Sequence, residues 1–352
     1  MTDIPTTMSA VLLTGHGDFD KLEVRDDVAV PRPGPHDVLI RVGAAGVNNT
    51  DINTRIGWYS KKDGADEDAS WAGVPLRFPR IQGADICGRI VAVGDAVSAA
   101  RIGDRVLVEP CIQEANGEDL ELPWYLGSEC DGGFADYCVV ASRHAVRIDS
   151  SLSDTELASF PCSYSTAENM LTRSRVGPND RVLVTGASGG VGSAAVQLAS
   201  ARGASVVAVT SPSKSADVIA LGAAQTIGRD DSTVGTLGRD SIDVVVDLVA
   251  GPHWPELLEV LRPGGRYAVS GAIGGPLVEL DVRTLYLKDL SLFGCTVLEP
   301  EVFDNLVDHI EQRRIGPVVA DVFPLAQIVE AQKAFLSKKH TGKIVLAVDD
   351  PH

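Results

Sequence analysis

Residues 182–199 read VLVTGASGGVGSAAVQLA, and this stretch decides the fold of the second half of the chain. An apolar strand runs into a glycine-rich turn, and small residues then open an alanine-rich helix. Glycines let the backbone approach a pyrophosphate closely, and the N–H groups of the helix start stabilise that anion. The pattern predicts a dinucleotide-binding turn, against the alternative of a tight turn without a ligand. The residues expected at the cofactor are Gly186, Ala187, Ser188, Gly189, Gly190, Val191 and Gly192.

The segments around this turn alternate between apolar strands and helices, which is typical of a parallel sheet covered by helices. Roughly six parallel strands are expected there. The first 150 residues instead read as short strands separated by turns. We therefore expect an α/β protein with a β-rich domain over 1–150, completed by 300–352, and a doubly wound nucleotide-binding domain over 151–299.

Composition limits the possible partners and compartments. The 352 residues carry 31 Lys and Arg against 48 Asp and Glu, a net charge of −17, which disfavours nucleic acids and anionic membranes as partners. No run approaches the roughly 18 apolar residues of a membrane span, and the first residues, MTDIP, do not resemble a signal peptide, so a cytoplasmic location is expected. The six cysteines form no C-x-x-C pair, so reduced thiols are expected.

The strand after the helix indicates which nicotinamide cofactor is bound. An NAD site places an acidic residue near the end of that strand, for the ribose hydroxyls. Here the strand ends in Thr210-Ser211-Pro212-Ser213-Lys214, with hydroxyls and a cation but no acid. Thr210, Ser211 and Lys214 suit a 2′-phosphate, so NADPH is expected over NADH, although Lys214 also fits an ordinary solvated lysine.

Two long acidic stretches, 60–79 and 109–132, exceed the usual loop length and are expected to form lids or lobes near a site. Aromatic residues fall in or beside them, and these would form a wall for planar substrates or anchor the loops. They are Trp58, Trp71, Trp124 and Tyr125.

Six strings together resemble the medium-chain dehydrogenase/reductase superfamily, and within it the zinc-free quinone oxidoreductase and enoyl reductase branch. They are GAAGVNNTDINTRIGWY (43–59), IQGADICGRIVAVG (81–94), RIGDRV (101–106), GGFADYCVV (132–140), the nucleotide motif 182–199, and HTGKIVL (340–346), with a glycine-rich β first domain. The resemblance implies a GroES-like, partly open β-barrel catalytic domain, a Rossmann doubly wound sheet, and an active site in the cleft between them.

The same resemblance bears on zinc. The metal-dependent members have a zinc-binding Cys where this chain has Asn48, and a zinc-binding His where it has Ala84. Cys162 matches a ligand position, and Asp85 resembles the acid of the zinc-free branch. One thiolate and one carboxylate are too few for an open catalytic zinc site. We therefore expect no zinc and no other metal.

Two residues are the candidates for chemistry. Tyr59 resembles the tyrosine that acts as proton donor in enoyl reductases, although it could simply anchor the following loop. The amide of Asn48 is expected to face the nicotinamide end and to donate to a substrate oxygen. Asp51 is interpreted as a helix cap and Asp85 as a buried or ion-paired acid.

The resemblance adds positions at the cofactor and an oligomeric state. Strand ends at 247–251 and 270–274, and the lysine of HTGKIVL, are implied to lie near the cofactor. The corresponding residues are Val249, Ser270, Gly271, Ala272 and Lys343. Residues 290–297 resemble the edge strand that pairs across a two-fold axis, so a homodimer is expected.

The leading functional hypothesis is an NADPH-dependent oxidoreductase that reduces a quinone, an enone or a related carbonyl compound without metal. The alternatives are a zinc-dependent alcohol dehydrogenase and an NADPH-binding protein without turnover.

Overall fold

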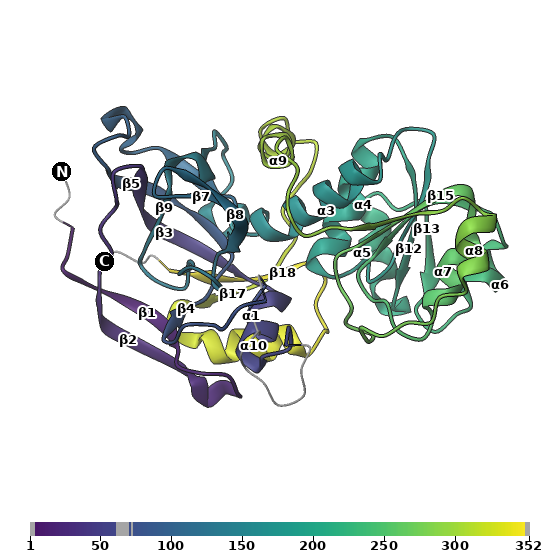
Figure 1. The fold of residues 1–352 in the computed structure, drawn as a ribbon, viewed down its shortest axis with the longest axis horizontal. Helices are drawn as coiled ribbons and strands as arrows, with labels where there is room; N and C mark the ends of the chain where they lie inside the picture. The colour runs from purple at the N-terminus through teal and green to yellow at the C-terminus, as the bar shows by residue number, and fades with distance from the viewer. Residues whose placement is uncertain (1–3, 61–69, 72, 349–352) are drawn as a thin grey trace. The chain divides into compact units, whose positions relative to one another are not determined.

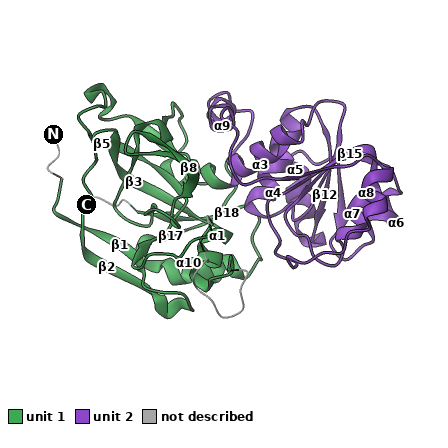
Figure 2. Cartoon of the chain, in the orientation of Figure 1, with its two compact units in different colours: residues 1–162, 317–352 green, residues 163–316 purple. Residues whose placement is uncertain are grey.

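The computed structural model describes residues 4–60, 70, 71 and 73–348 (Figure 1). The chain forms two compact units, unit 1 with residues 1–162 and 317–352, and unit 2 with residues 163–316 (Figure 2). These bounds lie beyond the expected divisions at 150 and 300. Helix α2 (Asp154–Leu157) packs on strands of unit 1, whereas Val297 and Glu299 hydrogen-bond Asn169 within unit 2. No helix of the described residues is both long and apolar enough to cross a bilayer.

Unit 2 contains a parallel six-stranded sheet in the order β13-β12-β11-β14-β15-β16. The chain steps outward from β11 to β13, then crosses to β14 and steps outward in the other direction, which confirms the expected doubly wound sheet. The strands are β11 (Arg181–Val184), β12 (Ser205–Thr210), β13 (Gln225–Gly228), β14 (Ile242–Asp247), β15 (Leu261–Val269) and β16 (Ser291–Gly294). All of β14 is buried, because helices cover both faces of such a sheet.

Helices α4 and α5 lie on one face of this sheet, and α7 and α8 lie on the other (Figure 1). The helices that lie wholly or mainly in unit 2 are α3 (Pro161–Arg173), α4 (Gly190–Ala201), η4 (Pro212–Lys214), α5 (Ser215–Ala220), α6 (Thr233–Leu237), α7 (Trp254–Val260), α8 (Val282–Leu287) and α9 (Val302–Glu311). The order in which successive strands join the sheet changes direction between the parallel neighbours β11 and β14. Ligands of doubly wound sheets bind at the carboxyl ends of the strands at such a point.

Unit 1 is built from a seven-stranded sheet, a three-stranded sheet and a hairpin. The seven-stranded sheet has the order β10-β6-β5-β3-β18-β17, with β9 also paired to β3. Its strands are β3 (Asp37–Val47), β5 (Asp85–Val93), β6 (Arg105–Val108), β9 (Tyr137–Ala141), β10 (Ala145–Arg147), β17 (Val319–Pro324) and β18 (Lys343–Ala347). The three-stranded sheet contains β1 (Thr7–Leu13), β2 (Leu22–Ala29) and β4 (Arg80–Ile81). The helical segments are η1 (Phe19–Lys21), α1 (Asn49–Ile56), η2 (Ala99–Arg101), η3 (Ser142–His144), α2, η5 (Leu325–Gln327) and α10 (Ile328–Leu336).

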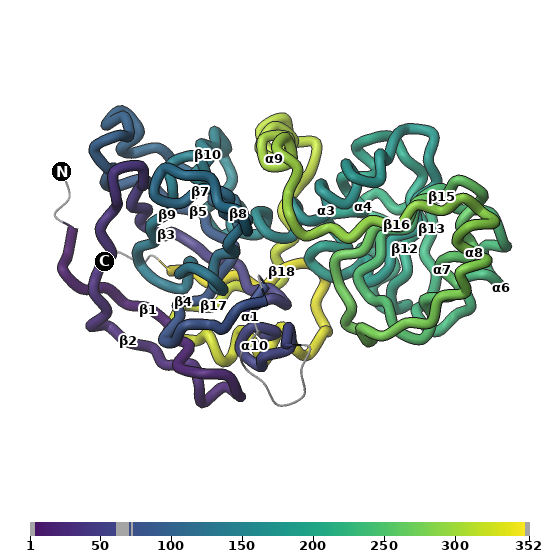
Figure 3. The backbone as a smooth tube through the Cα atoms, viewed as in Figure 1, coloured from purple at the N-terminus to yellow at the C-terminus, as the bar shows by residue number. Residues whose placement is uncertain are grey.

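The last strand of the chain lies beside one of the first (Figure 3). β18 runs antiparallel to β3, with Ile344 opposite Val47. This register brings Lys343 to the point where β3 ends and α1 begins, so residues almost 300 positions apart share one local environment.

Of the two long acidic stretches, residues 109–132 contain a hairpin of β7 (Cys111–Ala115) and β8 (Glu118–Tyr125). Its turn has Asn116 and Gly117 at φ 56° and 81°, the left-handed conformations that a tight hairpin turn requires. Most of the expected lobe at 60–79 lies outside the described residues.

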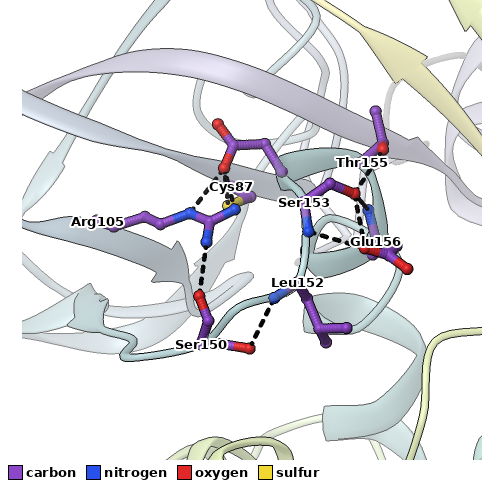
Figure 4. A network of polar contacts seen from close by, with 8 residues as sticks. Cys87, Arg105, Ser150, Leu152, Ser153, Thr155 and Glu156 are labelled. Carbon is purple, nitrogen blue, oxygen red and sulfur yellow. Dashed lines mark hydrogen bonds and ion pairs between the residues drawn. The ribbon is translucent and has the colours of Figure 1, made fainter.

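Helix α2 is joined to the barrel strands by a polar network (Figure 4). Ser153 and Glu156 form a capping box at its start, with Ser153 N–H donating to Glu156 Oε2 over 2.8 Å. The carboxylate of Asp154 accepts from Arg105 Nε at 2.7 Å and from the thiol of Cys87 at 3.7 Å. Arg105 also donates to the carbonyl of Ser150, so one guanidinium links β6 to the segment before α2.

Replacing Asp154 with Ala should lower the free energy of unfolding by about 1–3 kcal/mol, because the largely buried Arg105 loses its charged acceptor. Urea unfolding measures the change. Asp27→Ala is the matched control, since Asp27 pairs with Arg25 on an exposed surface and its loss should change little. Equal losses in both variants would contradict the role given to Asp154.

Candidate functional site

The predicted nucleotide turn joins β11 to α4 and has a tight backbone. Gly186 adopts φ +58°, in the left-handed region that favours glycine. A Cβ on Gly192 would lie 2.2 Å from the carbonyl oxygen of Gly186, so this close approach also needs glycine. Gly189 caps the 12-residue helix α4 and is exposed, and a Cβ there would meet nothing nearer than 3.5 Å. The helix start is therefore accessible, which fits a phosphate group.

The other residues expected at this turn lie where the fingerprint places them. Ala187 is buried, and its N–H donates to the carbonyl of Val209 over 3.1 Å, which joins the turn to β12. The remaining three, Ser188, Gly190 and Val191, are partly exposed at the turn and in the first residues of α4.

The end of β12 presents the residues expected at a 2′-phosphate. Thr210 is buried, and its Oγ1 has no hydrogen-bond partner among the described residues. The hydroxyls of Ser211 and Ser213 lie 3.3 Å apart. Burial lowers the pKa of Lys214, and the nearby guanidinium of Arg229 lowers it further. Two cations and three hydroxyls therefore gather at this end of the strand.

Arg229 was not predicted from the sequence, because it follows a different strand from Thr210 and Lys214. It follows β13, and its N–H donates to the carbonyl of Thr210 over 3.2 Å. Because β13 runs parallel to β12, the carboxyl ends of both strands meet at one edge of the sheet. A basic residue directly after the next predicted strand was the sequence feature that could have indicated it.

The turns after β14 and β15 are held by the buried carboxylate of Asp247. It accepts hydrogen bonds from Thr185 Oγ1 at 2.5 Å, from the phenol of Tyr267 at 2.6 Å and from the N–H of Val249 at 2.9 Å. Gly274 N–H donates to the carbonyl of Val249, so the two turns are also joined directly.

These bonds bring the predicted turns to the nucleotide turn. A Cβ on Gly186 would lie 3.2 Å from Val249 Cγ2, and one on Gly271 would lie 2.8 Å from the carbonyl oxygen of Leu248. Ser270 N–H donates to the carbonyl of Asp247, and Ala272 follows in the same turn. The structure thus brings together the ends of β11, β14 and β15, as expected for a cofactor groove.

Unit 1 contains a separate buried polar centre. Lys343 Nζ lies 2.6 Å from Asn48 Oδ1 and 2.6 Å from Asp85 Oδ2. Asn48 Nδ2 donates to the same Asp85 oxygen over 2.7 Å and makes a longer 3.4 Å contact with the carbonyl of Gly46. The other Asp85 oxygen accepts the N–H of Cys162 at 2.5 Å. Lys343 and Asp85 are 2% and 0% exposed, so this is a fully buried, hydrogen-bonded ion pair.

Asp51 caps the start of α1 next to this centre. Its Oδ2 accepts the N–H of Asn48 at 2.7 Å, and its Oδ1 accepts that of Gly83 at 3.3 Å. Burial raises the pKa of Asp51 to about 7, although the Asn48 hydrogen bond and the Lys343 charge oppose the rise. The geometry agrees with the helix-cap interpretation, and Asp51 is also the group of this centre that titrates near neutrality.

Tyr59 follows the end of α1, where Gly57 caps the helix at φ 70°. Its ring contacts Trp71 at 5.6 Å between centroids, and Trp71 in turn stacks on Tyr125 at 4.2 Å. Burial raises the pKa of Tyr59 to about 12, opposed by hydrogen bonds with the side chains of Thr50 and Asn53. The phenol therefore remains protonated throughout the neutral range.

The aromatic residues of the two acidic stretches separate into two groups. Trp71 and Tyr125 come together with Tyr59, and Trp58 contacts Tyr59 edge-on at 5.5 Å. Trp124 instead packs against the hydrophobic core of unit 1. A planar acceptor near Tyr59 would therefore meet aromatic rings from three separate segments.

The positions that correspond to zinc ligands do not form a ligand set in unit 1. Asn48 and Asp85 share the ammonium of Lys343, and Ala84 has no donor atom. Within the described ranges, no group of three or more His, Cys, Asp and Glu side chains is arranged to hold a metal ion. The donors at this centre are already matched to a cation of the chain itself, so they do not fit a zinc ion.

Two family models match the chain. Residues 34–150 match the alcohol dehydrogenase GroES-like domain, and residues 190–312 match the zinc-binding dehydrogenase domain. The human quinone oxidoreductase is 30% identical over 353 residues, covering 96% of this chain and 97% of the relative. The acryloyl-coenzyme A reductase of Metallosphaera sedula is also 30% identical, covering 96% and 99%.

Solved structures extend the similarity. A candidate alcohol dehydrogenase from Sinorhizobium meliloti 1021 is 43% identical, with a TM-score of 0.90 and 99% coverage of both chains. A cobalt- and zinc-bound alcohol dehydrogenase from Pyrobaculum aerophilum is 29% identical, with a TM-score of 0.83, covering 97% of this chain and all of that one. With relatives this similar over almost its whole length, the chain belongs to the medium-chain dehydrogenase/reductase superfamily of oxidoreductases.

Proposed function

We propose that this protein is an NADPH-dependent reductase that transfers a hydride to a quinone or to an activated C=C bond of an enone or enoyl compound, without a metal. The observation that carries the proposal is the ammonium of Lys343, 2.6 Å from both Asn48 and Asp85. The polar centre is built around a cation of the protein, where the metal-dependent members of the family would hold zinc. The names of the quinone oxidoreductase and acryloyl-coenzyme A reductase relatives support the same acceptor classes.

In this proposal the chain's own residues position the acceptor and supply a proton. NADPH, when bound, supplies the hydride, and the acceptor gains that hydride and one proton. The Tyr59 phenol provides the proton, because a group with a pKa of about 12 stays protonated at neutral pH. The resulting phenolate takes a proton back from water, which restores the starting state.

Asn48 has one N–H group that a substrate oxygen could use. One of its amide hydrogens is taken up by Asp85 at 2.7 Å, whereas the other makes only the 3.4 Å contact with Gly46. A distance of 3.4 Å marks a weak hydrogen bond, so a carbonyl oxygen would compete well for this donor. Lys343 has two partners within unit 1, and its contact with the cofactor remains a prediction.

Replacing Tyr59 with Phe should lower kcat for the best acceptor by about 10²–10⁴-fold, the usual contribution of a positioned general acid. The measurement is NADPH oxidation against a panel of quinones, enones and enoyl thioesters. Tyr137→Phe is the matched control, a partly buried tyrosine on β9 whose loss should leave kcat unchanged.

Metal analysis of the same sample should show no stoichiometric zinc. One zinc per chain, removed together with activity by a chelator, would overturn the metal-free reading.

The group at the end of β12 supports the choice of NADPH. Hydrogen bonds to a charged group typically contribute about 1.5–3 kcal/mol. Lys214→Ala should therefore raise the KM for NADPH by about 10–100-fold and leave the KM for NADH almost unchanged, and adding Arg229→Ala should enlarge the difference. Arg239→Ala is the control, because Arg239 is an exposed arginine of unit 2 that pairs with Glu259. Equal effects on both cofactors would contradict the assignment.

We also propose a homodimer that forms through the edge of the parallel sheet. β16 lies at that edge, and most exposed large apolar side chains of unit 2 lie in residues 273–297, which lead into and follow this strand. Leu277 and Leu287 are 91% and 71% exposed. Such a concentration of apolar surface beside an edge strand is typical of an interface.

The wild-type protein should therefore have the mass of a dimer in solution, and Leu287→Glu should shift it to a monomer, because a charge would be buried in the apolar interface. Light scattering after size-exclusion chromatography measures both masses. Leu122→Glu is the control, since Leu122 is 61% exposed on β8 and belongs to unit 1, whereas the proposed interface belongs to unit 2. A monomeric wild-type protein would refute the proposal.

A further inference from the structure

Trp71 makes a short polar contact with the first turn of α1. Its indole Nε1–H donates to Thr50 Oγ1 over 2.6 Å, and its ring is held against Tyr125 at 4.2 Å between centroids. Tyr125 is buried at the end of β8, so the indole packs against a rigid element. The contact therefore links Trp71 to Thr50, the second residue of α1.

The chemistry of indole determines which partner donates and which accepts in this hydrogen bond. An indole N–H only donates, so Thr50 Oγ1 must be the acceptor. A hydroxyl that accepts one hydrogen bond becomes a stronger donor for the next, because the bonds polarise one another. Thr50 also hydrogen-bonds the phenol of Tyr59. The indole therefore favours the arrangement in which Thr50 donates its proton to the phenol oxygen.

The side-chain amides of Asn49 and Asn53 form a second series of hydrogen bonds that leads toward Tyr59. Asn49 Nδ2 donates to Asn53 Oδ1 over 3.3 Å, which leaves the Nδ2 group of Asn53 to donate to its other partner, Tyr59. Thr50 and Asn53 can then both donate to the phenol oxygen. With both directed inward, the phenol's own hydrogen is left for an acceptor outside the protein.

We propose that Trp71 is a positioning residue that orients the Thr50 hydroxyl toward Tyr59 and so leaves the phenol proton available to the substrate. The inference rests on the proposed reductase function and adds to it a residue that precedes β4 in the chain. Trp71 acts through Thr50, and the transferred proton comes from Tyr59. Without the indole N–H, Thr50 can accept the phenol proton instead, and fewer Tyr59 groups present it to the substrate.

A double-mutant cycle tests the proposal. Trp71→Phe keeps an aromatic ring on Tyr125 but removes the N–H donor, and Thr50→Val removes the hydroxyl at similar size. Trp71→Phe alone should lower kcat by roughly three- to tenfold, the range expected for one neutral hydrogen bond. Thr50→Val removes the donor and the competing acceptor together, so it should lower kcat by less. In the Thr50→Val background, Trp71→Phe should lower kcat no further, whereas in a Thr50→Ser background, which keeps the hydroxyl, its full effect should return.

The outcomes separate a packing role from the proposed one. If Trp71 only packs, its replacement lowers kcat by the same factor whether or not residue 50 has a hydroxyl, and that result would overturn the inference. If Trp71→Phe does not fold, as judged by near-ultraviolet circular dichroism, benzothienylalanine at position 71 keeps the ring shape without the N–H donor and replaces it in the cycle. Tyr59→Phe tests the proposed reductase function separately, because it removes the proton donor itself. Unchanged kcat in that variant would contradict the proposed function, whatever the result of the cycle.

Discussion

The buried ion pair between Lys343 and Asp85 is the interaction on which the polar centre of unit 1 depends. Transfer of two charges out of water costs several kcal/mol per ion, and the pair is favourable only when its remaining donors and acceptors are matched. Here Asn48 contacts both partners, and the N–H of Cys162 occupies the second carboxylate oxygen. Within unit 1 the pair therefore holds β18, β5, the end of β3 and the backbone of Cys162 together.

That arrangement determines where α1 begins, and Tyr59 follows from it. Asn48 is the cap residue of α1, and Asp51 bonds back to its N–H. The far end of the same helix is held by Arg55, which is 2% exposed and donates to Gln332 of α10 and to the carbonyl of Gly17. With both ends of a short helix held, the turn at Gly57 sets the position of Tyr59. A side chain that must meet a reacting atom needs this kind of support from packed elements.

The sequence predicted those features that neighbouring residues determine. The turn at Gly186–Gly192 and the parallel sheet follow from local pattern, because strand, turn and helix are consecutive in the chain. Arg229 and the contact between Trp71 and Thr50 did not follow, because each depends on which segments the fold brings together. Asn48 was expected to donate to a substrate oxygen, which stays a prediction, but the contacts of its amide with Lys343 and Asp85 were not expected. One lysine that returns from the far end of the chain accounts for that difference.

Tyr59 and Asp51 of unit 1 both have pKa values raised by burial, but the consequences differ. Burial raises the pKa of Tyr59 to about 12 and that of Asp51 to about 7. Tyr59 is therefore a neutral donor at every pH at which the enzyme would work. Asp51 keeps its proton in the folded protein up to about pH 7, whereas the unfolded chain releases it near the ordinary value of 3.8, so its contribution to stability falls as the pH rises between these values. Above pH 7 the ionised Asp51 adds a negative charge near Lys343, so a change of activity with pH near neutrality is expected to follow Asp51, with the proton donor unchanged.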